Sequence, residues 1–158
     1  MLNTDLNTRE IVMPTISKLM VALMATALVM SLAATAAADD SVAIEVRAIA
    51  ASPDGDEFDS RLDDIEQRLE RGFSDYSSFR QIDRHHKTIE RDESAEFELP
   101  TGDVLVLSYN GRADDFVRLG LQLEDRFSTT LRATPGSTFF QAGLVYDEST
   151  LVLAITVE

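Results

Sequence analysis

Apolar and polar residues alternate in several short segments of the chain, and this two-residue period predicts β-strands. The first such segment, residues 41–52, carries Val42 and Ile44 on one face and Glu45 and Arg47 on the other. That division is typical of a half-buried strand, with the charged side chains facing away from the core. A Ser-Pro-Asp-Gly-Asp sequence follows and predicts the turn that ends the strand.

The next segment, residues 57–73, has a helical period instead. Its apolar residues recur every three or four positions and therefore share one stripe of a helix: Phe58, Leu62, Ile65, Leu69 and Phe73. Acidic residues occupy the first turn and arginines the last, as the helix dipole favours. Gly72 is placed to end the helix. The pattern predicts one amphipathic helix.

The rest of the chain predicts about seven short strands joined by tight turns. Val104–Tyr109 is apolar on both faces, which is typical of a central strand. Residues 116–125 alternate cleanly, with valine and leucine side chains on the inner face. Asn110-Gly111 predicts a hairpin turn, and a last hairpin is expected across Asp147–Ser149.

These elements together predict the class of fold. Short links between successive strands favour antiparallel pairing, and an amphipathic helix needs an apolar sheet face to cover. We therefore predict an α+β fold: an antiparallel β-sheet or a small two-sheet sandwich with one packed amphipathic helix. Residues 39–158 are expected to form a single domain, preceded by a signal peptide.

The N-terminal residues resemble a secretory signal peptide. Residues 19–32 form an uncharged apolar run, shorter than the roughly 20 residues that span a bilayer. Ala36 and Ala38 supply the small residues of a cleavage site. We predict a signal peptide over residues 1–38 and no stable membrane span after its cleavage. An uncleaved N-terminal anchor is the alternative.

The first twelve residues do not fit the basic start of a signal peptide, because they contain Asp5 and Glu10. A start at Met13 leaves only Lys18 as a charged residue before the apolar run. We therefore predict that the protein begins at Met13. A precursor peptide mapped upstream of that residue would contradict this prediction.

Composition narrows the possible functions further. The net charge is −14, which repels phosphate backbones, and no basic patch is visible, so no nucleic-acid partner is expected. The chain has no cysteine, which excludes disulfides, thiolate metal sites, cysteine nucleophiles and a lipoprotein anchor. Together with the predicted signal peptide, the absence of cysteine indicates bacterial-type export to the periplasm or the medium.

The two histidines, His85 and His86, are adjacent in the sequence. In a strand they point to opposite faces, so they cannot bind one metal ion together. Asp83 and His85 are two residues apart and can share a face, but Lys87 comes next on that face and opposes a cation. A solvated polar strand is the simpler interpretation of this segment.

The acidic loop that contains Asp54 and Asp56 is the second candidate for a metal site. Its glycine and Phe58 do not fall where a calcium loop of the EF-hand type requires glycine and acidic residues. Capping of the following helix by Asp54 or Asp56 explains the same residues. We therefore predict no catalytic, cofactor or metal residues, with His85, Asp83, Asp54 and Asp56 as the candidates considered.

Three motifs resemble a family of small exported bacterial proteins of unknown function: Tyr-Ser-Ser-Phe at residues 76–79, Glu-Leu-Pro-Thr-Gly-Asp at 98–103, and the C-terminal hairpin. In that family a helix precedes the Tyr-Ser-Ser-Phe strand and a Gly-Gly-Thr turn precedes the last hairpin. Here the turn reads Gly136-Ser137-Thr138. The resemblance implies a non-enzymatic envelope protein.

The sequence thus predicts an exported binding or interaction module, periplasmic or secreted, that acts through its sheet edges or loops. Its expected partner is a protein of the cell envelope, and it would serve as an accessory to an envelope or secretion assembly. The alternative interpretation is a metal-dependent or hydrolytic enzyme that uses His85 and nearby acids. Substitution of both histidines distinguishes the two.

Overall fold

Eight β-strands and two short helical segments make up residues 41–158, which are the residues that the computed structural model describes. The predicted signal peptide over residues 1–38, its Met13 start and its cleavage site lie outside the described residues. Within residues 41–158, no helix is both long enough and apolar enough to cross a bilayer.

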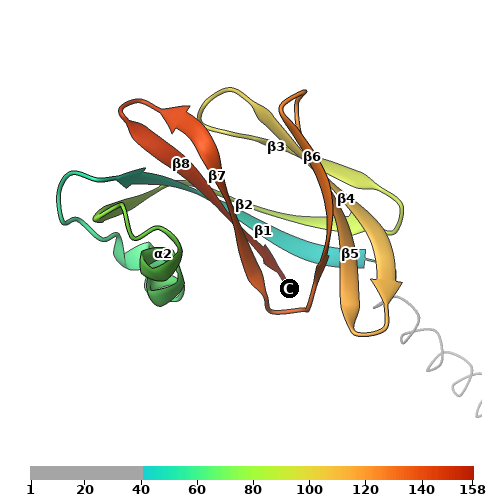
Figure 1. The fold of residues 1–158 in the computed structure, drawn as a ribbon. Coiled ribbons are helices and arrows are strands. Elements are labelled where there is room, and N and C mark those ends of the chain that lie inside the picture. The colour runs from blue at the N-terminus through green and yellow to red at the C-terminus, as the bar shows by residue number, and fades with distance from the viewer. Residues whose placement is uncertain (1–40) are drawn as a thin grey trace, which may run out of the picture. The chain divides into compact units, whose positions relative to one another are not determined.

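The strands form two four-stranded antiparallel sheets (Figure 1). Sheet A has the strand order β2–β1–β8–β7, and sheet B has the order β3–β4–β5–β6. The strand bounds are β1 Ser41–Ser52, β2 Ser78–Glu90, β3 Ser94–Glu98, β4 Val104–Ala113, β5 Phe116–Leu123, β6 Phe127–Ala133, β7 Thr138–Tyr146 and β8 Ser149–Val157. The predicted antiparallel pairing is therefore confirmed, and of the two arrangements that the sequence left open, one sheet or two, the structure has two sheets.

The strand order in space follows the order of the strands along the chain, with two interruptions. Each strand pairs with the next in sequence, except that the chain passes from sheet A to sheet B between β2 and β3, and returns between β6 and β7. The last strand then pairs with the first, from Ile44 opposite Val157 to Ala51 opposite Thr150. The two interruptions are called here the β2–β3 seam and the β6–β7 seam.

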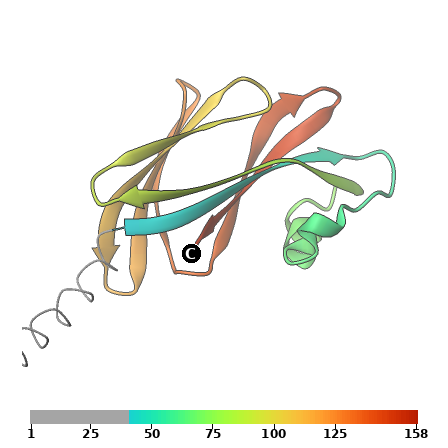
Figure 2. The same cartoon turned by 180° about the vertical axis from the view of Figure 1, so that it is seen from behind.

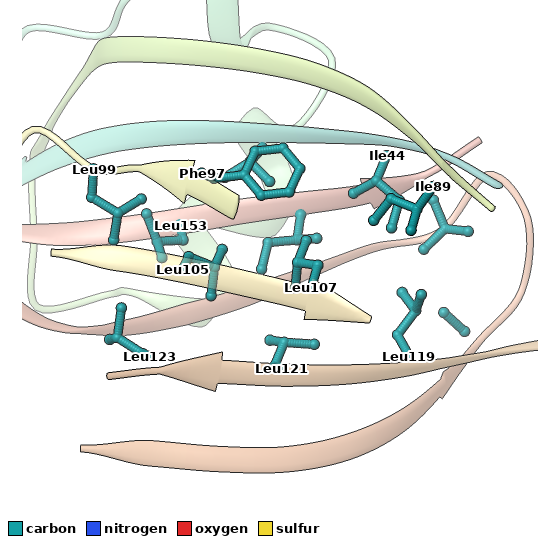
Figure 3. Packing of buried hydrophobic residues seen from close by; sticks show 14 of the residues in the cluster. Ile44, Ile89, Phe97, Leu99, Leu105, Leu107, Leu119, Leu121, Leu123 and Leu153 are labelled. Carbon is teal, nitrogen blue, oxygen red and sulfur yellow. The ribbon is translucent and has the colours of Figure 1, made fainter. Parts of the chain in front are cut away.

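The core lies between the sheets, where alternate residues of the strands point inward. Figure 3 shows Leu105 and Leu107 of β4 and Leu119 of β5 facing Ile44 of β1 and Leu153 of β8. The inward faces predicted for residues 41–52 and 116–125 are confirmed, because these alternate side chains are buried. Each fully buried leucine or isoleucine contributes about 1.5–3 kcal/mol through the hydrophobic effect.

The opposite face of sheet A is covered at one end by the helical segments η1 (Ser60–Leu62) and α2 (Glu66–Gly72). They lie where β1 ends and β2 begins (Figures 1 and 2). The helical stripe packs through Leu62, Ile65 and Leu69, which are fully buried, onto a second apolar cluster of sheet A. A packed amphipathic segment was predicted at this position, and the structure has one.

The helix is shorter than the predicted span, and its caps differ. Phe58 pairs with Phe79 in a parallel bridge, with Asp59 donating its backbone N–H to the Phe79 carbonyl at 3.0 Å. This long-range pairing holds the start of the segment extended. Asp59, rather than the predicted Asp54 or Asp56, therefore caps the first helical turn, and Gly72 is the last helical residue instead of lying beyond the end.

The prediction of a hairpin turn at Asn110-Gly111 is also wrong. Both residues lie inside β4, where the register with β5 shifts between Tyr109 and Arg112. Gly111 has φ +78°, which favours glycine at this bulge. The hairpin itself turns four residues later, at Asp114 and Asp115, where Asp114 adopts a left-handed conformation.

Candidate functional site

The histidines lie on β2, one of the two edge strands of sheet A, and point to opposite faces of that sheet. His85 is opposite Val46 of β1, whose side chain is in the core between the sheets, whereas His86 is opposite Glu45 on the outer face. The prediction that the two cannot share one metal ion agrees with this register.

His85 helps to close the β2–β3 seam. Its Nε2 atom lies 2.9 Å from Asp83 Oδ2, although it has no aligned hydrogen-bond partner. Its ring packs edge-on against Phe97 of β3, with the centroids 6.3 Å apart. Lys87 lies over the Phe97 ring, with Nζ 5.1 Å from the ring centroid, and its ammonium group donates a hydrogen bond to the Glu96 carbonyl. The ammonium group of Lys87 repels a bound cation. His85, Phe97 and Lys87 therefore pack against one another across the seam and do not form a metal site.

A different group meets a distance criterion for metal binding. Glu45, His86 and Glu158 are the one set of three or more potential ligands that residues 41–158 bring together, with ligand atoms within 4.8 Å of one another. Asp54, Asp56, Asp83 and His85 are outside this set. His86 and Glu158 are exposed, whereas only 2% of the Glu45 surface is accessible.

The buried Glu45 carboxylate is already shared by two arginines. Arg47 donates to Glu45 Oε1 through its Nε atom, and Arg84 Nε donates to Oε2 at 2.6 Å. Both terminal nitrogens of Arg47 also donate hydrogen bonds to the Asp64 carboxylate, at 2.7 and 2.6 Å. These bonds connect sheet A to the segment between η1 and α2. Sequence reasoning placed Glu45 and Arg47 on an exposed face, but this network buries them.

The network stabilises its charged forms. Burial favours neutral Glu45, but the hydrogen bonds from Arg47 and Arg84 outweigh burial and hold the pKa of this carboxyl below its ordinary value. The hydrogen bonds from Arg47 likewise lower the pKa of Asp64. A metal ion at Glu45 would have to displace two guanidinium groups and then remain close to them. The electrostatics therefore favour a structural ion-pair network over a metal centre.

The β6–β7 seam is open, in contrast to the β2–β3 seam. β6 and β7 are the terminal strands of their sheets and pair on one side only. In both views they are close at their connection and separate toward their other ends (Figures 1 and 2). Two cavities lie along this opening, with volumes of about 230 Å³ and about 290 Å³.

The cavities have mixed linings with more apolar than polar surface, and each includes one arginine, Arg126 at the first and Arg132 at the second. The first is bordered by Phe127 of β6, by Gln141 and Leu144 of β7, and by Leu151 and Leu153 of β8. The second lies nearer the connection and is bordered by Phe116, Leu131 and Phe139. Phe116 is 41% exposed although it is aromatic. The arrangement offers two apolar depressions beside free strand edges.

The two seams also differ in the charge of their strands. β2 carries two histidines and the charged residues Arg80, Asp83, Arg84, Lys87 and Glu90. β7 has no charged residue along its nine positions, and β6 has only Arg132. Charged side chains on an edge strand prevent pairing with another chain. The edges at the β6–β7 seam lack this protection.

The comparisons with known proteins provide no family assignment: no protein-family model, curated protein or solved structure matches the chain significantly. The β6–β7 seam was not identified as a site from the sequence. The uncharged composition of residues 138–146 is visible there, but its importance depends on the position of that strand at a sheet edge.

Proposed function

We propose that this protein is an exported interaction module that binds an extended segment of a partner protein at the β6–β7 seam. The segment adds to the free edge of β7 as a fifth strand of sheet A, and its alternate side chains enter the two apolar cavities. Export and an envelope partner are the expectations from the predicted signal peptide; the binding mode rests on the seam.

The observation that carries the proposal is the uncharged edge of β7, which is interrupted only by a register shift at Gly143. An edge strand presents unpaired backbone N–H and C=O groups, and an extended peptide can satisfy them by strand addition. On β7 this edge is uncharged and lies beside cavities lined by Phe127, Leu144 and Phe139. Backbone pairing then supplies affinity, and the cavities select the side chains.

The test uses the full-length protein and nine-residue peptides, matched to the length of β7. Their sequence alternates valine and threonine, and each is flanked at both ends by lysines, serines or glutamates. Hydrogen–deuterium exchange measures the protection of each strand. We expect at least one peptide to slow exchange in β7 and to leave β2 unchanged.

A pair of variants provides the control. Gln141→Lys with Val145→Lys puts two charges on β7, where Val145 is 77% exposed, and we expect it to abolish peptide binding. Thr88→Lys with Gln122→Lys adds the same charge at exposed positions of β2 and β5. Binding that survives in the β7 variant, or no protection of β7 by any peptide, would refute the proposed function.

A further inference from the structure

We infer that the segment bound at the β6–β7 seam is apolar in its middle and basic at its ends. This inference rests on the proposed function and specifies the chemistry of the partner. It is drawn from the distribution of charge around the seam, which is uneven between the strands and the turns that join them.

The strands of the seam carry only one charged residue, Arg132, and their connection at residues 134–137 is uncharged, but three neighbouring turns are acidic. Three exposed pairs of acids occupy the β4–β5, β5–β6 and β7–β8 turns: Asp114 and Asp115, Glu124 and Asp125, and Asp147 and Glu148. Each pair is close in sequence to a residue of the seam. The first pair precedes Phe116, which borders the second cavity, and the second pair precedes Arg126, which borders the first.

The acidic pairs are positioned at both ends of the seam. Val117 pairs with Ala133, so the β4–β5 turn lies at the end of β6 where the chain crosses to β7. Leu123 pairs with Phe127, so the β5–β6 turn lies at the other end of β6. The β7–β8 turn directly follows Tyr146, at the far end of β7. A segment lying along the seam therefore has acids near both of its ends.

Two arginines border the cavities and offset part of this acidic charge. Arg132 of β6 borders the second cavity. Arg126 borders the first, and its guanidinium already contacts Asp103, with Nη2 3.6 Å from Oδ1. The six acids of the turns outnumber these two arginines. Lysine or arginine residues flanking an apolar partner segment would meet complementary charge, which speeds association and selects against acidic partners. A second copy of this chain does not provide that charge, because each copy carries a net charge of −14.

The experiment compares the three flanked peptides at low and high ionic strength by titration calorimetry. We expect the lysine-flanked peptide to bind about tenfold more tightly than the serine-flanked one at low salt, and the glutamate-flanked one to bind most weakly. The difference should shrink at about 0.5 M salt, where the Debye length is only a few ångströms.

Two variants locate the effect. Asp125→Lys with Glu148→Lys reverses charge beside the seam, and we expect it to remove the preference for lysine flanks. Glu93→Lys with Glu98→Lys makes the same change in net charge at exposed positions on the opposite edge, and we expect the preference to remain. Equal loss in both variants would overturn the inference, because it would show an effect of total charge alone.

The remaining outcomes separate the two proposals. Equal affinity of all three peptides, with β7 protected, would overturn the basic-ended partner and leave strand addition standing. A failure of every peptide to protect β7 would overturn strand addition itself. Self-association through β7, detected by sedimentation and abolished by Val145→Lys, would replace the basic partner with a second copy of the chain.

Discussion

The Glu45 carboxylate shows how a single residue acquires a different role from the one its strand position suggests. Alternation along residues 41–52 correctly separates an apolar face from a charged one. However, Arg47 on that charged face is held by Asp64, which lies 17 positions further along the chain. Burial of the charged face therefore depends on a tertiary contact, and the period of one strand carries no information about it.

We expect Glu45→Leu to lower the free energy of unfolding by roughly 3 kcal/mol, because it leaves the buried Arg47 without one of its two acidic partners. Urea denaturation measures the loss. Adding Arg47→Met should recover part of it, since replacing both charges with apolar groups avoids an unpaired buried ion. A double variant less stable than the single one would contradict this assignment.

At the scale of elements, predictions held where local pattern decides the structure. The inner faces of β1 and β5 follow from alternation, and the burial of Leu62, Ile65 and Leu69 follows from the helical period of residues 57–73. The ends of elements were less predictable. Pairing of Phe58 with Phe79 displaced the helix start, and the bulge at Gly111 displaced a turn. The first depends on a strand distant in sequence, and the second on a register shift between the consecutive strands β4 and β5, so local turn and capping signals missed both.

Substitution by alanine should change the stability in opposite directions at two glycines, one at a helix end and one at a bulge. Gly72 is helical and has open space around it, so Gly72→Ala should raise stability by about 0.5 kcal/mol. Gly111 has φ +78°, a backbone conformation that strains an L side chain, so Gly111→Ala should cost about 1–2 kcal/mol. Thermal unfolding of both variants checks the signs, and stabilisation by Gly111→Ala would show that the bulge does not require glycine.

At the scale of the whole molecule, the two seams define the architecture. An antiparallel fold with one packed helix was foreseeable from the sequence, because each element has its own pattern, but the choice between one sheet and two was left open. The seams were not, because they depend on where the chain changes sheets and on which edges then face each other. The sequence contained the difference in charge between β2 and β7. Only the topology shows that both are edge strands, so that one edge of sheet A is charged and the other is not.

We expect amide exchange to follow this architecture. β1 and β8 have paired neighbours on both sides and are largely buried on both faces, so their amides should exchange only through near-global unfolding. β6 is paired on one side and mostly exposed, so it should exchange fastest among the strands of sheet B. Exchange in β6 as slow as in β1, for the protein alone, would contradict an open seam.

The pairing of β8 with β1 has a consequence for how the chain folds. Ile44 is opposite Val157, so this contact joins residues at the two ends of the described chain. Contacts of such high sequence separation slow folding, since a large loop must close before they form. During synthesis, one edge of β1 has no partner until β8 has been made. Sheet A therefore stays incomplete until its last strand is available, and a chain without β8 exposes the unpaired edge of β1 to aggregation.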